Sequence, residues 1–323
     1  MCGIVGYIGS RRAYPILIKG LQRLEYRGYD SAGIALITDD NNSIVTYKQA
    51  GKVSDLLEFI GDNDTNGSIG IGHTRWATHG PPNQINSHPH SSSDGSFSLI
   101  HNGIIENYSS LKKVLEEKGY IFKSDTDSEV LMYLIECVYK TQLKESKDIC
   151  GDLFYDSIRI ALNEVVGAYA IVVIDKNNSE EFYAARKGSP LVIGIGNNEY
   201  FVASDASPII EYTDKVIYLK DGEVARLNKN QEVEIKTIDN KKKSPYIQKL
   251  EQSIESIEKG GYDHFMLKEI FEQPKSIIDT LRGRINPKTN DIVLGGVKDY
   301  ESKISTADRL IIIACGTSWH AGL

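Results

Sequence analysis

The sequence is short of the features that would place a protein in a membrane, on a nucleic acid or in an oxidising compartment. Its longest apolar runs, such as residues 310–315, are far below the roughly 20 residues that cross a bilayer. Lysine and arginine number 37 against 44 acidic residues, and the net charge of −7 gives no electrostatic reason to expect nucleic acid or an anionic membrane as partner. The four cysteines include no CxxC pair, which argues against a disulfide framework and a structural zinc site. Glycines interrupt the opening residues, so no secretory signal is present and we expect a cytoplasmic protein.

The chain is long enough for one and a half to two globular domains, with 323 residues of which 41% are hydrophobic and 25% charged. Residues 239–246 are polar and basic and include Pro245, which predicts a linker between a first domain over residues 2–238 and a second over 247–323. In the second part, an apolar strand predicted over residues 309–315 runs into a Gly-Thr-Ser turn. Because a strand feeding such a turn usually opens a βα unit, we expect this domain to be incomplete.

Short β-rich runs alternate with helical stretches before the linker. Strands are predicted over residues 3–8, 32–37, 43–47, 69–75, 97–102, 169–174, 182–185, 191–195, 200–203, 215–219 and 224–227. Helices are predicted over residues 14–24, 53–60, 108–118, 127–139 and 153–165. Most strands are apolar on both faces, which indicates a sheet covered on both sides. Asp221-Gly222 predicts a hairpin between the last two strands, and Thr126 with Glu129 predicts a capping box.

Cys2 stands where removal of Met1 would leave it as the first residue. Its own α-amine, with a pKa of about 8, can then take up the thiol proton, and no side-chain base is required. Position alone also fits a small buried cysteine in a first strand with Met1 retained. The neighbouring motifs therefore decide between these two interpretations.

Two strand ends carry groups suited to an amide substrate. His-Thr-Arg-Trp-Ala-Thr-His-Gly at 73–80 places Arg75 where a guanidinium can grip a carboxylate through two parallel hydrogen bonds. His-Asn-Gly at 101–103 offers the Asn102 amide and the Gly103 N–H as a donor pair for a developing oxyanion. Taken alone, Arg75 equally fits a surface salt bridge and Asn-Gly a simple turn.

The helix start Ser-Asp-Thr-Asp-Ser-Glu-Val at 124–130 supplies a carboxylate. Asp127 can bind an ammonium group there, although helix capping explains Asp125 and part of Asp127. Five of the seven histidines lie within residues 73–101, but their spacing matches no common zinc pattern, so we predict no metal and structural roles. Together the nucleophile, the oxyanion donors, the cation and the anion describe a site for a zwitterionic amino acid with an amide side chain.

Long motifs in a fixed order resemble the glutamine–fructose-6-phosphate aminotransferases, also called glucosamine-6-phosphate synthases. The first are Met-Cys-Gly-Ile-Val-Gly-Tyr-Ile-Gly at the start, Leu-Glu-Tyr-Arg-Gly-Tyr-Asp-Ser-Ala-Gly at 24–33, the motifs at 73–80 and 101–107, and Ala-Arg-Lys-Gly-Ser-Pro-Leu-Val-Ile-Gly at 185–194. Lys-Glu-Ile-Phe-Glu-Gln-Pro at 268–274 and Ala-Cys-Gly-Thr-Ser at 314–318 extend the resemblance along the whole chain.

The resemblance implies an α+β fold, an αββα sandwich of the N-terminal-nucleophile hydrolase type. Such a class II glutaminase domain hydrolyses glutamine to glutamate and ammonia through a thioester, without a cofactor. Cys2 corresponds to the nucleophile, and Asn102 and Gly103 correspond to the oxyanion hole. Positions that correspond to glutamine-binding residues are Arg75 for the α-carboxylate, Asp127 for the α-amine, and Trp76, Thr78 and His79 in the covering loop. Trp76 also resembles the family's gate on the ammonia passage.

In the family a second half, built from paired sugar-isomerase domains, combines fructose 6-phosphate with ammonia and forms the homo-oligomer. Residues 247–323 resemble only the beginning of that α/β domain. A partial sugar-phosphate site is implied at Cys315, Gly316, Thr317 and Ser318. The resemblance thus implies that this chain alone releases ammonia without making glucosamine 6-phosphate.

Two other interpretations stay open. The chain can be the glutaminase half of another amidotransferase, such as an amidophosphoribosyltransferase, but the motifs at 268–274 and 314–318 argue against that. It can also be a truncated binding module without catalysis. The intact set of Cys2, Arg75, Asn102, Gly103 and Asp127 argues against the silent module.

Overall fold

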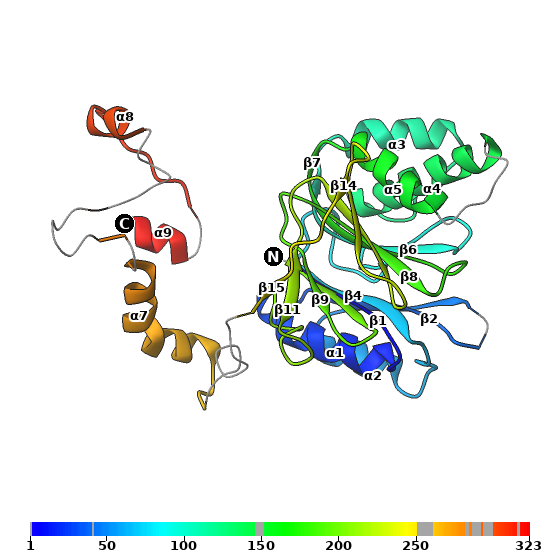
Figure 1. Cartoon of the computed structure of the whole chain (residues 1–323), viewed down its shortest axis with the longest axis horizontal. Coiled ribbons are helices and arrows are strands. Elements are labelled where there is room, and N and C mark those ends of the chain that lie inside the picture. The colour runs from blue at the N-terminus through cyan, green and yellow to red at the C-terminus, as the bar shows by residue number, and fades with distance from the viewer. Residues whose placement is uncertain are drawn as a thin grey trace. The chain divides into compact units, whose positions relative to one another are not determined.

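The computed structural model describes residues 2–40, 42–145, 152–250, 261–281, 284–285, 292, 300–314 and 317–323. Met1–Ile257 form one compact unit and Glu258–Leu323 a second, and each is described by itself. Two antiparallel sheets make up the first unit, with helices on their outer faces (Figure 1). Among the described residues no helix is long and apolar enough to cross a membrane.

An eight-stranded sheet has the strand order β15-β11-β9-β10-β1-β4-β2-β3. Its strands are β1 (Gly3–Ile8), β2 (Ser31–Ile37), β3 (Ile44–Ala50), β4 (Ile69–Arg75), β9 (Val192–Ile195), β10 (Tyr200–Ala203), β11 (Lys215–Tyr218) and β15 (Gln248–Lys249). Helices α1 (Ala13–Leu24) and α2 (Val53–Ile60) cover its outer face (Figure 1). Leu17, Leu21 and Leu24 fall on one face of α1, as their spacing predicts, and pack in the core beneath the helix.

The second sheet has seven strands in the order β14-β13-β12-β8-β7-β6-β5. These strands are β5 (His90–Ser91), β6 (Phe97–Ile105), β7 (Gly167–Asp175), β8 (Glu181–Lys187), β12 (Glu223–Asn228), β13 (Glu234–Thr237) and β14 (Lys242–Lys243). Helices α3 (Tyr108–Glu117), α4 (Asp127–Glu145) and α5 (Asp152–Asn163) cover its outer face (Figure 1). Phe97, Phe154 and Tyr183 stack and cross in the core between these helices and the sheet.

A third apolar core lies between the two sheets. Ile4 and Ile8 of β1 pack there with Ile100, Val172 and Phe182 from the other sheet. Each sheet is therefore buried on both faces, which explains why its strands are apolar at odd and even positions alike. This layering confirms the predicted α+β sandwich.

The Asp221-Gly222 hairpin prediction is wrong. Strand β11 pairs with β9 and β15 in one sheet, whereas β12 pairs with β8 and β13 in the other. The turn therefore carries the chain from one sheet to the other. Gly222 still adopts the left-handed φ of +75° that its type predicts, and its N–H donates to the carbonyl of Arg186 at 2.8 Å.

The capping box predicted at the start of α4 is half correct. The Glu129 N–H donates to Thr126 Oγ1 at 3.3 Å, as expected. The Glu129 carboxylate, however, accepts from the N–H groups of Lys123 and Ser124 and from Ser124 Oγ. It thus ties down the segment before the helix instead of the cap residue itself.

The predicted linker 239–246 contributes β14 to the first unit, and β15 follows it. The second unit contains α7 (Phe265–Leu281), α8 (Glu301–Ser305) and α9 (Thr317–Gly322). The strand predicted over 309–315 is wrong for its described part: residues 309–314 form no strand, and Ile313 is 92% exposed. A strand needs a neighbour for its N–H and C=O groups, and no described residue pairs with this run. The division into two domains stays a prediction.

The core between the sheets predicts a large effect of one substitution. Phe182→Ala removes a fully buried ring there and is expected to lower the free energy of unfolding by roughly 3–5 kcal/mol. Ile121→Ala, at a position with an exposed side chain, is the control and should change it by less than about 0.5 kcal/mol. Urea unfolding followed by circular dichroism measures both, and equal effects would contradict the assignment of this core.

Candidate active site

The central strand β1 positions Cys2 at its amino end. Strand β1 lies between β10 and β4, and Gly3 of β1 pairs with Thr74 of β4. At Gly3 a Cβ would stand 2.6 Å from Thr74 Oγ1, so only glycine allows this approach. Cys2 therefore lies beside the end of β4, and the N–H of Trp76 donates to its Sγ at 3.2 Å.

Eight residues predicted for glutamine chemistry line one cavity of about 520 Å³. They are Cys2, Arg75, Trp76, Thr78, His79, Asn102, Gly103 and Asp127. They come from β1, from β4 and the loop after it, from β6 and from α4. The structure thus brings together groups up to 125 positions apart in the sequence, and their individual roles stay predictions.

The Cys2 thiol needs a base. Burial raises its pKa above the ordinary cysteine value, although the hydrogen bond from the Trp76 N–H acts in the opposite direction. At neutral pH the resting group is therefore the thiol, which is a poor nucleophile until its proton is removed.

The Asn102 amide has a defined orientation. Its Nδ2 donates to the carbonyl oxygen of Cys2 at 3.1 Å, and its Oδ1 accepts from His73 Nε2 at 2.8 Å. An amide nitrogen carries two N–H groups, so one stays available beside the thiol. Next to it, Gly103 has φ +135°, and a Cβ there would lie 2.0 Å from the carbonyl oxygen of Ala168. Only glycine fits at that position.

The sequence predicted a structural role for His73. In the structure, His73 sets the direction of the Asn102 amide. Burial lowers the pKa of His73 to about 3, so the ring is neutral and its Nε2–H donates. The His73 ring stacks on His88 at 4.1 Å between centroids, and the His88 ring meets His90 at 4.8 Å. A signal was present in the sequence: His73 and Arg75 are two residues apart in one strand and so share a face.

Arg75 holds the loop that follows it. Its side chain is 4% exposed, and the guanidinium donates to the carbonyl oxygen of Pro81 at 3.4 Å and to that of His79. Asp30, which the sequence did not single out, accepts from the N–H of Ala77 in the same loop. The loop that lines the cavity is thus tied to the sheet from two sides.

Asp127 opens α4 but does more than cap it. Its Oδ2 accepts from the N–H of Ile105 in β6 at 2.8 Å, which links the helix start to the strand carrying Asn102. Within the described part of the chain, the one contact of its Oδ1 is with the hydroxyl of Ser128 at 3.5 Å. A carboxylate oxygen at the cavity wall with one long contact can accept from an ammonium group.

The other predicted residues belong either to the covering loop or to the predicted sugar-phosphate site. Trp76 is 55% exposed, and Thr78 Oγ1 lies 3.3 Å from His79 Nδ1 in the covering loop. Of the residues predicted for sugar phosphate, Cys315 and Gly316 lie outside the described residues, as does the side chain of Thr317. Ser318 is in α9 of the second unit. Among the described residues no group of three or more His, Cys, Asp or Glu is arranged to hold a metal ion.

Comparisons with known proteins find similarity to glutamine amidotransferases. A family model described as "Glutamine amidotransferase domain" matches residues 73–211. The glutamine–fructose-6-phosphate aminotransferases (isomerizing) of Bacteroides thetaiotaomicron and Chlorobaculum tepidum are 57% and 50% identical to the chain over all of it, which corresponds to 51% of each relative. The glutamine phosphoribosylpyrophosphate amidotransferase of B. subtilis, solved with ADP and GMP, has a TM-score of 0.60 at 28% identity, covering 73% of this chain and 49% of that one.

The fold and the matched domain first define the class, a glutamine amidotransferase built on the N-terminal-nucleophile sandwich. Identity over all of its residues then shows that the chain is similar to the glutamine–fructose-6-phosphate aminotransferases (isomerizing). The chain spans about half the length of the curated relatives it matches.

The buried histidines predict that stability falls with acid. Burial lowers the pKa of His73 from 6.5 to about 3, so below pH 6.5 the unfolded chain binds a proton that the folded chain does not. The contribution of the neutral His73 ring to the free energy of unfolding is therefore fully present above pH 6.5 and is lost as the pH falls toward 3. Between pH 7 and pH 5 we expect His73 alone to lower the free energy of unfolding by roughly 2 kcal/mol.

Urea unfolding at the two pH values measures this difference. His73→Gln should flatten the pH dependence, and His264→Gln, at an exposed position in the second unit, is the matched control that should leave it unchanged. Equal stability of the unsubstituted chain at pH 7 and pH 5 would show that the His73 ring is not held neutral by burial.

Proposed function

We propose that this chain hydrolyses L-glutamine to glutamate and ammonia through a thioester on Cys2. The observation that carries the proposal is the single cavity that holds the Cys2 thiol, the Asn102 amide, the guanidinium of Arg75 and the Asp127 carboxylate. Each group complements one part of glutamine: the side-chain amide carbon, its oxygen, the α-carboxylate and the α-ammonium, respectively.

The first step is attack of Cys2 Sγ on the side-chain carbonyl carbon of glutamine. Once Met1 is removed, the α-amine of Cys2 takes the thiol proton. Such a base is required because burial raises the pKa of that thiol. An S–C bond forms and the carbonyl electron pair moves onto oxygen. The same ammonium then gives its proton to the leaving nitrogen as the C–N bond breaks, so ammonia departs and a thioester remains.

Water completes the cycle. The α-amine of Cys2 accepts a proton from the attacking water, a second tetrahedral intermediate forms, and its collapse breaks the C–S bond. Glutamate leaves and the proton returns to Sγ. In both intermediates the oxygen anion is stabilised by the free N–H of Asn102 and by the N–H of Gly103. His73 acts as a positioning residue, because it holds the amide oxygen of Asn102 away from that anion.

The α-groups of glutamine orient the substrate. Arg75 already donates to two loop carbonyls, and its remaining N–H groups suit the α-carboxylate. Asp127 Oδ1 suits the α-ammonium. Thr78 and His79 belong to the loop that Arg75 and Asp30 tie down, and Trp76 links this loop directly to the thiol through its N–H.

Similarity to these relatives supports a wider proposal for the whole protein. The curated relatives are named for transfer of the glutamine nitrogen to fructose 6-phosphate. We propose that ammonia released at Cys2 serves that reaction, forming glucosamine 6-phosphate in the cytoplasm as part of a homo-oligomer, with no cofactor in the glutaminase step. The chain alone is proposed to be a glutaminase. A silent binding module is disfavoured because every group that the chemistry requires lines the one cavity.

The first functional prediction concerns the nucleophile. A folded sample shown by intact mass to lack Met1 should release glutamate from glutamine, and Cys2→Ala should abolish this release while calorimetry still detects glutamine binding. Binding survives because Arg75 and Asp127 are unchanged. Undiminished turnover by the variant would eliminate Cys2 as nucleophile, and no release by the Met1-free chain would sink the proposal.

The second concerns His73. His73→Phe removes the donor that orients Asn102, so kcat should fall by roughly 10²-fold, as for loss of an oxyanion-hole donor, with KM within about threefold. His73→Gln keeps an N–H donor and should recover most of the rate. A merely structural role for His73 would appear as equal losses in both variants, or as a change in KM instead of kcat.

A further inference from the structure

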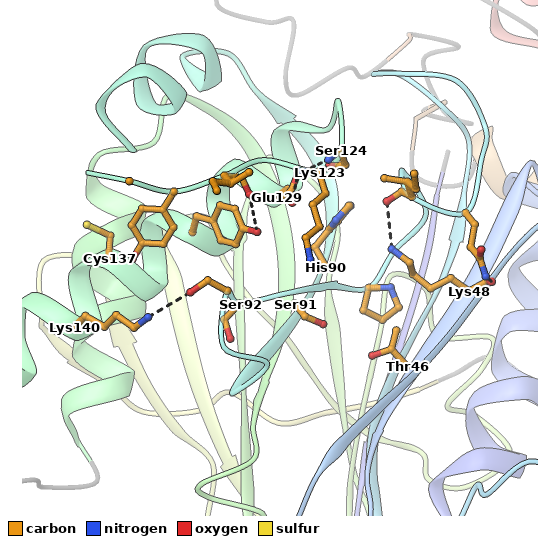
Figure 2. A pocket seen from close by; sticks show the side chains of 18 of the residues that line it. Thr46, Lys48, His90, Ser91, Ser92, Lys123, Ser124, Glu129, Cys137 and Lys140 are labelled. Carbon is orange, nitrogen blue, oxygen red and sulfur yellow. Dashed lines mark hydrogen bonds between the residues drawn. The ribbon is translucent and has the colours of Figure 1, made fainter. Parts of the chain in front are cut away.

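A second cavity, of about 1510 Å³, lies between β3 and β5 and is closed by residues 118–124 and α4 (Figure 2). It shares no lining residue with the cavity that contains Cys2. Strands β3 and β5 are the outermost strands of their sheets, so this cavity occupies the open side of the sandwich. The glutaminase chemistry makes no use of it.

Positive charge dominates the lining of this cavity. One carboxylate, that of Glu129, faces five ammonium groups. The lysines are Lys48, Lys118, Lys123, Lys140 and Lys144. Since the whole chain carries a net charge of −7, this local surplus is opposite in sign to the rest of the molecule. Such a concave surface raises the local concentration of anions.

The nearby carboxylates do not neutralise the surplus. Glu129 accepts from the backbone N–H groups of Lys123 and Ser124 and from the Ser124 hydroxyl. Lys140 is paired with Glu136 and lies 3.8 Å from Asp94. Within the described part of the chain, the other four lysines have no carboxylate at ion-pair distance.

Lys48 shows most clearly that an anion would be stabilised here. Its Nζ donates to the carbonyl oxygens of Ser87 at 2.8 Å and Ile85 at 3.3 Å, both of which are neutral acceptors. Burial lowers the pKa of Lys48 to about 8 although the charge of Glu129 acts in the opposite direction, which means that the ammonium group lacks full solvation. An ammonium group has three donors, so one remains for an incoming anion.

Hydroxyls and aromatic rings complete the lining. Figure 2 shows Lys48 and Lys140 on opposite sides of the cavity, with His90, Ser91 and Ser92 between them. Tyr120 and Tyr133 lie tilted against each other, with ring centroids 5.2 Å apart, and offer an apolar surface beside the charges. A ligand with an anionic end and a ring would therefore match both parts of the wall.

We propose that this cavity binds a small organic phosphate, a sugar phosphate or nucleotide, whose anionic groups are held by the lysines of the lining. Several flexible ammonium groups suit a phosphate of charge near −2 better than the planar, singly charged carboxylate, which favours arginine. The organic part contacts the tyrosine wall. The cavity volume exceeds what inorganic phosphate fills, so an ester should bind more tightly than the free ion.

Isothermal titration calorimetry on the full chain tests the proposal with inorganic phosphate, glucose 6-phosphate, ATP and citrate as probes. At least one phosphate ester should bind with a Kd below about 1 mM and more tightly than citrate or inorganic phosphate. The variant Lys123→Gln/Lys144→Gln changes two exposed positions and should weaken that binding by about tenfold or more. Lys48→Met should have an effect of the same sign.

The matched control is Lys113→Gln/Lys220→Gln, which removes the same charge from exposed positions outside the cavity and should leave Kd within about twofold. The proposal is overturned if no phosphate ester binds, if citrate binds as tightly as the best ester, or if the control pair weakens binding as much as the cavity pair. Binding that survives the cavity variants unchanged lies elsewhere and also overturns it. None of these outcomes depends on glutaminase activity.

Discussion

Two hydrogen bonds of Asn102 join the halves of the sandwich at the point where the chemistry is proposed. Asn102 belongs to β6 of the seven-stranded sheet. Its partners belong to the other sheet: the carbonyl of Cys2 lies directly before β1, and the ring of His73 is in β4. The proposed nucleophile and the proposed oxyanion donors therefore lie in different layers. Their mutual position depends on how the sheets pack, and the buried core between them acts as the support of the site.

Burial is what makes this junction specific. His73 can donate from Nε2 only as a neutral ring with that tautomer, and its desolvated position beside His88 keeps it neutral. The same burial raises the pKa of the Cys2 thiol, which creates the need for a base. Burial therefore sets the protonation of both groups. In the proposed mechanism the α-amine of Cys2 supplies the base that the thiol requires, without another buried charge.

Local patterns in the sequence predicted most of the first unit, because both period and turn chemistry agree there with the final fold. The bounds of β1, β4 and α2 match their predictions. Pairing across the molecule was not predictable: Asp221-Gly222 has the composition of a hairpin but passes between sheets, since the neighbours of β11 and β12 are decided by distant strands. For the same reason the apolar run before Cys315 looked like a strand although no described strand pairs with it.

The residues of the site were likewise only partly predictable from the sequence. Motifs identified Cys2, Arg75 and Asp127 because each lies at a strand end or helix start, where ligand-binding side chains concentrate. Asn102 was predicted at the end of a strand over residues 97–102, but β6 continues to Ile105 and Asn102 lies within it. His73 and Asp30 were not predicted as site residues because they hydrogen-bond to other protein groups, and the partners in such contacts cannot be read from the sequence. For His73, only the face it shares with Arg75 gave a signal.

The two-layer origin of the site has a mechanical consequence. The Cys2 thiol and the N–H groups of Asn102 and Gly103 are carried by separate sheets. The distance between them therefore depends on the thickness of the apolar layer that holds the sheets apart. A substitution that thickens or thins that layer changes this distance without contacting Cys2, Asn102 or Gly103. The apolar layer thus also sets the spacing of the site, and adding or removing one methylene far from Cys2 is a way to adjust the geometry of the proposed catalysis.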